Sequence, residues 1–189
     1  MPPNDKTKVY IFGASGSGTT TLGAALADAL SLVHVDADDH YWAPVDPPYS
    51  VKRTPEERRA SLEAALGSKG WVLSGACDSW AGHMLQQADL LVFLFLPSDL
   101  RVARLIARET QEFGARIEEG GDMHGIHTGF LEWAKGYDDP AFQGRSLAAH
   151  ETWMATQSIP ICRIEQDQPV SASLDQVLLA LQKAQQNAK

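Results

Sequence analysis

The sequence predicts an α/β fold in which a parallel β-sheet is covered by helices on both faces. Short apolar runs of strand length alternate with longer stretches whose apolar residues recur at helical spacing. This alternation runs along the chain without internal repeats or low-complexity blocks. Consecutive parallel strands need crossover connections, which helices supply. At 189 residues the chain is long enough for one domain with subdomains.

The first strand and the first helix flank a glycine-rich loop. Residues 8–12 form a short β-branched and aromatic run, which predicts a strand. Residues 21–30 carry apolar side chains at helical spacing. The loop between them comprises Gly13, Ala14, Ser15, Gly16, Ser17, Gly18, Thr19 and Thr20.

This loop fits the phosphate-binding P-loop pattern except where the lysine belongs, and that position is Thr19. Its glycines can turn successive N–H groups toward one point at the positive end of the following helix. We therefore expect the loop to bind a nucleotide polyphosphate, with the Thr20 hydroxyl as a Mg²⁺ ligand. The alternative is an ordinary glycine-rich turn. The strand before it, the helix after it and the threonine at the metal position favour the P-loop.

The remaining elements follow in the same alternation. Ligands of such sheets bind at the carboxyl ends of the strands, so the segments after each strand are where a site is expected. We expect strands at residues 32–35, 71–74, 90–96 and 159–164, and helices at residues 55–66, 98–113, 147–156 and after Ser171.

Acidic residues follow the second strand. In an extended segment Asp36 and Asp38 point the same way, so both carboxylates can face the phosphate loop. One can bind Mg²⁺ through water, and we expect Asp36 in that role. The other, Asp38, can orient or deprotonate a substrate hydroxyl. The alternative is an acidic turn that caps the next helix, and for Asp39 that interpretation is at least as good.

The third strand is followed by small residues. Gly75 lets the backbone approach a ligand closely. Asp78 or Ser79 can equally be the N-cap of a helix. Trp42 and Trp80 can stack on a substrate ring, although a tryptophan at a strand end more often packs against a helix.

Three arginines follow the fourth strand. Arg101, Arg104 and Arg108 are spaced by three and four residues, so they project from one face of the predicted helix. The arginine fork suits phosphate because it donates two hydrogen bonds and stays charged. Because Glu109 and Glu112 are nearby, a solvated face of ion pairs is the alternative, most of all for Arg101.

The segment 114–136 changes character. It combines many glycines with scattered charges and aromatics, which predicts a mobile lid over a phosphate site. Its cations are Arg116 and Lys135. His124 and His127 can bind a metal, but the sequence offers them no companion ligands in a recognisable pattern.

Beyond this segment, Arg145 precedes a predicted helix and can point back into the site. His150 and Trp153 are interpreted as packing residues of that helix.

The net charge, the two cysteines and the length of the apolar runs indicate which partners and which cellular compartment to expect. A net charge of −8 provides no electrostatic footprint for nucleic acid or an anionic membrane. Cys77 and Cys162 lack zinc-like spacing, and we expect both to be reduced in a cytoplasmic protein. We see no signal peptide before the first strand, and the apolar run 90–97 is too short to cross a bilayer.

Together these features resemble the P-loop kinases of small molecules, which include adenylate kinase-like nucleoside monophosphate kinases, shikimate kinase and gluconate kinase. The resemblance covers nearly the whole chain, although only the P-loop is highly specific. It implies a three-layer P-loop NTPase fold with sheet order 2-3-1-4-5 and an ATP site on residues 13–20. It also implies an acceptor-binding subdomain at about 38–70 and a closing lid at about 114–137.

The same resemblance assigns roles to single residues. Asp38 and Gly75 would build the acceptor pocket, and Arg116 of the lid would contact the substrate. Arg104 and Arg108 match arginines before the lid, and Arg145 matches one after it. Residues 165–170 would lie near the adenine.

The sequence therefore predicts a kinase that transfers the γ-phosphoryl of ATP, with Mg²⁺, to a small metabolite or a nucleoside monophosphate. Thr19 removes a charge worth on the order of 4 kcal/mol at an intermediate dielectric, so an arginine must replace it or transfer is weak. The alternatives are a nucleotide-binding regulator and a slow ATPase. The sequence identifies neither the acceptor nor the oligomeric state.

Overall fold

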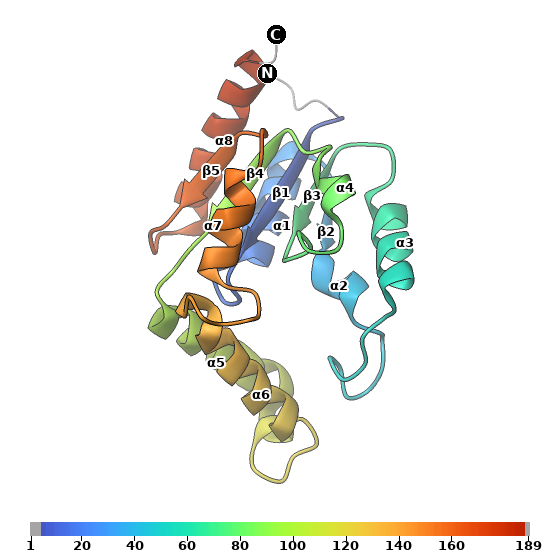
Figure 1. Cartoon of the computed structure of the whole chain (residues 1–189), viewed down its shortest axis with the longest axis vertical. Helices are drawn as coiled ribbons and strands as arrows, with labels where there is room; N and C mark the ends of the chain where they lie inside the picture. The colour runs from blue at the N-terminus through green and yellow to red at the C-terminus, as the bar shows by residue number, and fades with distance from the viewer. Residues whose placement is uncertain (1–4, 188–189) are drawn as a thin grey trace.

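In the computed structural model, which describes residues 5–187, five parallel strands form one sheet with the order β2-β3-β1-β4-β5 (Figure 1). This confirms the predicted α/β class and the strand order that the resemblance implies. The strands are β1 (Lys8–Gly13), β2 (Val33–Asp36), β3 (Trp71–Ser74), β4 (Leu90–Leu94) and β5 (Ile161–Ile164).

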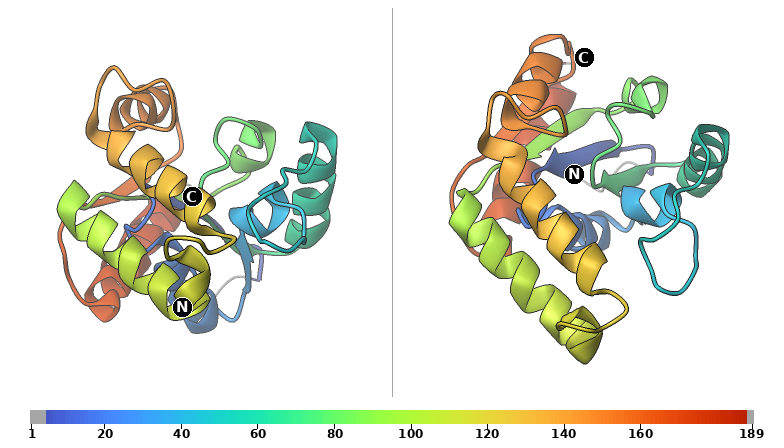
Figure 2. Two further views of the ribbon diagram at one scale, coloured as in Figure 1. Left: turned by 90° about the horizontal axis from the view of Figure 1, so that it is seen from below. Right: turned by 60° about the horizontal axis from the view of Figure 1, so that its bottom comes forward.

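Helices cover both faces of the sheet, and a pair of them extends beyond its carboxyl edge (Figures 1 and 2). The α-helices are α1 (Thr19–Leu30), α2 (Ala37–Tyr41), α3 (Pro55–Leu66), α4 (Gly82–Leu85), α5 (Ser98–Phe113), α6 (His124–Lys135), α7 (Leu147–Ala155) and α8 (Val170–Asn187). Two 3₁₀ turns, η1 (Gly114–Ile117) and η2 (Gly136–Asp138), flank α6.

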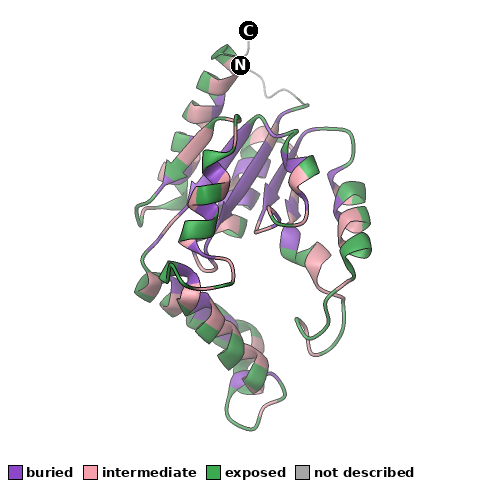
Figure 3. Ribbon diagram, viewed as in Figure 1, coloured by how far each residue is buried: buried purple, intermediate pink, exposed green. Residues whose placement is uncertain are grey.

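The core consists of two apolar layers, one on each face of the sheet. Along β1, Tyr10 and Phe12 point into the layer that includes residues of α3, α4 and α7. Val9 and Ile11 point into the opposite layer, against α1 and α8. Strands buried on both faces need apolar residues at every position, which explains the unbroken apolar runs in the sequence. Figure 3 shows the buried sheet between its partly exposed helices.

The predicted bounds of α3 and α5 agree with the structure because strong end signals set them. Thr54 caps α3 through a reciprocal capping box with Glu57, and Pro55 occupies the first turn. Gly114 ends α5 with φ at +52°, where a side chain would be strained. The fourth and fifth strands are shorter than predicted, since β4 ends at Leu94 and β5 begins at Ile161.

The segment after α5 is mostly helical, which the sequence did not predict. Here α6 runs beside α5 as a hairpin (Figure 2). His127 Nδ1 lies 2.5 Å from Glu109 Oε2 and joins the two helices. A Cβ added at Gly125 or Gly129 would meet open space, so both glycines lie away from the packed side. Tertiary contacts here override the low helix propensity of glycine.

Candidate active site

The predicted P-loop connects β1 to α1 and packs tightly against β4 and α5. A Cβ at Gly13 would lie 2.1 Å from the Leu94 carbonyl oxygen. A Cβ at Gly16 would lie 2.6 Å from the Arg101 carbonyl oxygen, and Gly16 has φ at +83°. Only glycine fits at these two positions without a shift of the backbone. The loop is therefore held in one shape by β4 and α5.

The loop presents unpaired polar groups where an anion would bind. Helix α1 begins after Gly18 without a hydrogen bond from a capping side chain. Its first N–H groups consequently keep their capacity to donate to a ligand. Ser17 Oγ is buried and has no hydrogen-bond partner in residues 5–187. Both observations fit a phosphate group in the loop.

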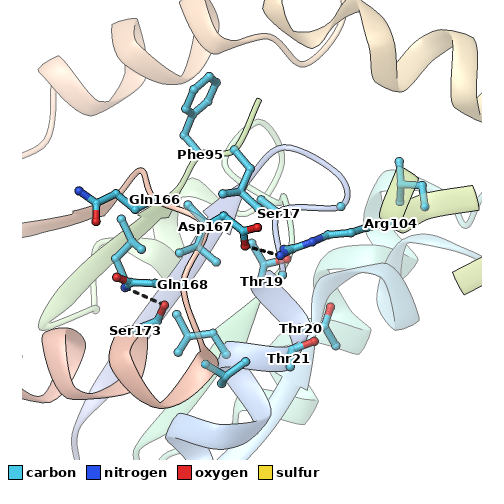
Figure 4. A pocket seen from close by; sticks show the side chains of 18 of the residues that line it. Ser17, Thr19, Thr20, Thr21, Phe95, Arg104, Gln166, Asp167, Gln168 and Ser173 are labelled. Carbon is cyan, nitrogen blue, oxygen red and sulfur yellow. Dashed lines mark hydrogen bonds and ion pairs between the residues drawn. The ribbon is translucent and has the colours of Figure 1, made fainter. Parts of the chain in front are cut away.

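A cavity of about 570 Å³ opens in front of this loop (Figure 4). Its volume lies within the usual range of small-ligand sites. The segment after β5, which the resemblance places near adenine, forms part of its wall. The lining side chains include those of Thr19, Thr20, Phe95, Arg104, Arg108, Gln166, Asp167 and Gln168.

The two predicted metal ligands are in direct contact. Thr20 Oγ1 donates a hydrogen bond to Asp36 Oδ2 over 2.7 Å. Asp36 Oδ1 accepts from the Asp38 N–H at 3.0 Å, so Asp36 also caps α2. The prediction of an extended segment after the second strand is thus wrong, because this cap starts a helix at Ala37. The cap is Asp36 and not Asp39.

Asp36 and Asp38 nevertheless line a common pocket of about 330 Å³. Thr20 and Arg108 line this acidic pocket as well as the larger cavity, so the two spaces adjoin. The remaining lining residues are His34, Asp39, Tyr49 and Glu112. A nucleotide and a second molecule can therefore meet beside Thr20.

Charges of both signs act on the Asp38 carboxyl. Burial raises the pKa of its carboxyl, and the charge of Asp36 raises it further, whereas Arg145 and Arg108 oppose the shift. Gly75 lies close by with φ at +90°, and a Cβ there would be 3.2 Å from Asp36 Oδ1. Gly75 thus leaves space for the acidic residues and not only for a ligand.

The three arginines of α5 lie along one side of the helix, as their spacing predicts, but their surroundings differ. Arg101 is fully buried, and its guanidinium donates to the Leu96 carbonyl at 2.8 Å and to Asp138 Oδ2 at 2.6 Å. A solvated face of ion pairs is therefore wrong for Arg101, which instead braces η2. Arg104 pairs with Asp167 at 2.6 Å, and Arg108 lies 3.5 Å from Glu109.

Arg145 was expected to point back into the site and Arg116 to contact the substrate, and the two lie in different settings. Arg145 forms no ion pair within the described part of the chain; its guanidinium lies 5.0 Å from the Trp133 ring centroid. Burial raises the pKa of Asp38 and of Asp78, and the charge of Arg145 opposes both shifts. Arg116 is instead paired with Asp122 and with Asp46, at 2.6 and 2.7 Å. It lines neither of the two cavities described above.

The sequence did not predict a row of buried polar side chains that lies beside Arg145. The Tyr137 hydroxyl lies 2.8 Å from His150 Nδ1, and His150 Nε2 lies 3.9 Å from Asp78 Oδ1. His150 is buried as predicted, but its Nε2 has no hydrogen-bond partner in the described residues. Burial raises the pKa of Asp78. Neither Asp78 nor Ser79 is an N-cap, because α4 starts after Ala81.

The other aromatic and histidine candidates have packing roles. Trp80 and Trp153 pack against the core layer that contains Tyr10. His124 Nδ1 lies 3.0 Å from the Ile117 carbonyl oxygen. Across residues 5–187, no group of three or more His, Cys, Asp and Glu side chains is arranged to hold a metal. Within the same residues, no helix is long and apolar enough to span a membrane.

Comparison with known proteins places the chain in a family. YqaC, an uncharacterized protein of Bacillus subtilis, is 42% identical over 174 residues, which cover 92% of this chain and 96% of YqaC. The chain belongs to the YqaC family. No protein-family model matches it.

More distant relatives are nucleotide kinases. The cytidylate kinase of Pyrococcus horikoshii is 30% identical over 133 residues, which cover 62% of this chain and 63% of that enzyme. The cytidylate kinase of Haloarcula marismortui is 27% identical over 117 residues, covering 56% and 60%.

Solved structures with the same fold include small-molecule kinases. A gluconokinase from Sinorhizobium meliloti has a TM-score of 0.54 at 16% identity and covers 98% of this chain and 97% of its own. Shikimate kinase from Acinetobacter baumannii, in complex with shikimate, has a TM-score of 0.52 at 16% identity and covers 95% and 94%. At these identities the likeness shows the P-loop kinase fold alone.

Proposed function

We propose that the chain is a Mg²⁺-dependent kinase that transfers the γ-phosphoryl of ATP to a small metabolite or a nucleoside monophosphate. One observation carries the proposal. The Thr20 and Asp36 oxygens, 2.7 Å apart, lie where the cavity before the glycine-rich loop meets the acidic pocket. A transferase needs a donor site and an acceptor site that share such a boundary.

The residues at this boundary fit both ATP and Mg²⁺. The uncapped start of α1 and the unpartnered Ser17 hydroxyl suit the phosphates. Thr20 and Asp36 offer the hard oxygen ligands that Mg²⁺ prefers, directly or through water. Bound there, Mg²⁺ would neutralise charge on the transferring phosphate.

The acceptor is assigned to the space around Asp38. Asp38 can accept a hydrogen bond from the acceptor hydroxyl and orient its oxygen, and Arg145 can hold an anionic group of the acceptor. Gly75 keeps the backbone at the end of β3 clear of the acidic residues. Residues 38–70 would form the acceptor-binding subdomain and residues 114–137 the lid, with Arg116 at its tip.

The missing P-loop lysine does not by itself rule out transfer. Arg104 and Arg108 both line the cavity in front of Thr19 and can supply positive charge to the phosphates. A nucleotide-binding regulator or a slow ATPase needs no second pocket for an acceptor, and the space around Asp38 provides one. The kinase is therefore the favoured function.

The test is ADP formation that depends on an acceptor. Purified protein with Mg-ATP would be assayed against gluconate, shikimate, cytidine monophosphate and adenosine monophosphate, and against a wider metabolite set. Asp38→Asn should lower the acceptor-dependent rate by about a hundredfold or more while ATP affinity is kept. Asp28→Asn, at an exposed position near the end of α1 and outside both cavities, is the matched control. Equal ADP formation with and without every acceptor would contradict a kinase and indicate an ATPase.

A further inference from the structure

One ion pair joins two walls of the nucleotide cavity. Arg104 Nη2 of α5 lies 2.6 Å from Asp167 Oδ1, in the segment between β5 and α8. Both side chains line the cavity, and Thr19 lines it too. Figure 4 shows Arg104 and Asp167 pointing toward each other near the glycine-rich loop. A guanidinium is thus already present beside the position that lacks its lysine.

Arg104 and Arg108 are the two arginines in the lining of this cavity, and their positions differ. Arg108 also lines the acidic pocket with Asp36 and Asp38. Its charge therefore lies at the boundary between the proposed donor and acceptor sites. Arg104 lines only the nucleotide cavity, as Thr19 does. Of the two arginines, Arg104 is thus the one that lines only the cavity that Thr19 lines.

The pair with Asp167 is easily exchanged for a ligand. The side chains of Arg104 and Asp167 are 45% and 49% exposed. Exposed ion pairs contribute little to stability, because water screens both charges. A triphosphate offers several charged oxygens, and arginine can bind two of them at once. Nucleotide phosphate can thus displace the Asp167 carboxylate from Arg104.

We propose that Arg104 supplies the positive charge that a lysine at position 19 would supply, and that Asp167 is its counter-ion in the nucleotide-free protein. This inference rests on the proposed binding of Mg-ATP. It gives Arg104 a catalytic role, in contact with the phosphates. Asp167 competes with nucleotide for Arg104, because its carboxylate pairs with the guanidinium until phosphate replaces it.

A charge-relocation experiment tests the proposal. Calorimetric titration with Mg-ATP and Mg-ADP would compare the wild type with Arg104→Ala, Thr19→Lys and the double variant. Arg104→Ala should weaken both affinities by about tenfold or more. The double variant should recover to within about threefold of the wild type, because the new lysine restores the lost charge. A residue that acts only on folding would not be rescued in this way.

Three further substitutions serve as comparisons. Thr19→Lys should not rescue Arg108→Ala, whose charge lies toward the acidic pocket. Arg59→Ala removes an arginine of similar exposure, paired with Glu56 on α3, and should leave nucleotide affinity unchanged. Asp167→Asn frees Arg104 from its counter-ion and should tighten Mg-ATP binding by about twofold to fivefold.

The outcomes separate this inference from the proposed function. Wild-type binding of Mg-ATP with less than twofold loss in Arg104→Ala would overturn the role of Arg104 and leave the kinase proposal standing. Failure of Thr19→Lys to rescue Arg104→Ala would overturn it as well. Loss of binding in Asp167→Asn would overturn the counter-ion role and make Asp167 a nucleotide ligand. Absence of wild-type binding would overturn both the inference and the proposed function.

Discussion

The Thr20 hydroxyl on α1 donates to the Asp36 carboxylate at the end of β2, over 2.7 Å. This contact links the phosphate loop to β2, which β3 separates from β1 in the sheet, and it brings together two oxygen ligands suited to Mg²⁺. Thr20→Val preserves the shape of the side chain but removes the hydroxyl. It should raise the Mg²⁺ concentration needed for ATP binding by about tenfold, whereas Thr20→Ser should behave like the wild type. Titration of Mg²⁺ at fixed ATP measures the difference, and equal requirements in all three proteins would exclude Thr20 as a ligand.

Comparing alanine substitutions at two glycines distinguishes the effect of backbone strain from an effect on the proposed Mg²⁺ site. Gly75 and Gly67 both have positive φ, at +90° and +60°, so alanine is strained at either position. Each Gly→Ala variant should lose about 1–2 kcal/mol of unfolding free energy in urea titrations. A Cβ at Gly75 would also press on Asp36, whereas one at Gly67 meets open space. Only Gly75→Ala should therefore change the Mg²⁺ requirement. The same change in Gly67→Ala would refute this explanation.

Buried Arg101 should make a large contribution to stability. Its guanidinium pairs with Asp138, donates to the Leu96 carbonyl and lies over the Tyr137 ring. Arg101→Met leaves these acceptors unpaired and should lower the free energy of unfolding by about 3–5 kcal/mol. Arg59→Met, at an exposed pair, should change it by about 0.5 kcal/mol or less. Chemical unfolding monitored by tryptophan fluorescence gives both values, and similar losses in the two variants would contradict the assigned role.

His150 should make the protein sensitive to acid. Burial and then the Arg145 charge lower its pKa to about 4, although Glu151 opposes the shift. Above its ordinary pKa of about 6.5 the imidazole is neutral in both states. As the pH falls from there to about 4, the unfolded chain binds the proton first, so stability falls by about 3 kcal/mol. The groups that face this ring are Tyr137, Asp78, Arg145 and Glu151.

Urea unfolding at neutral pH and near pH 4.5 measures this loss. His150→Gln cannot take up the proton, so its stability should fall less than that of the wild type over the same range. An identical pH dependence in the two proteins would show that other groups cause the acid sensitivity.

Local signals in the sequence predicted much of the fold. The apolar run of β1, the glycine-rich loop and the start of α1 are contiguous, so their order alone defines the loop. Thr54, Pro55 and Glu57 fix the start of α3 through contacts within four residues. The meeting of Thr20 with Asp36 followed from strand order, because parallel strands end at the same edge.

Features that depend on distant contacts could not be predicted in the same way. Helix α6 contains two glycines, and its stability comes from packing on α5, including the contact between His127 and Glu109. The spacing of the arginines places them on one side of α5, but it does not show which of them is buried. Arg101 is buried, and its partner Asp138 lies 37 residues further along the chain. Asp78 and His150 are likewise brought together only by the packing of α7.

The most direct test of the account is calorimetric titration of the wild-type protein with ATP, in the presence of Mg²⁺ and with Mg²⁺ withheld. We predict micromolar binding that depends on Mg²⁺, because the loop, the pair of Thr20 and Asp36, and the cavity arginines act together. Absence of binding in wild type, with binding restored by Thr19→Lys, would contradict it. That result would mean that the loop keeps its shape without the charge that a nucleotide needs.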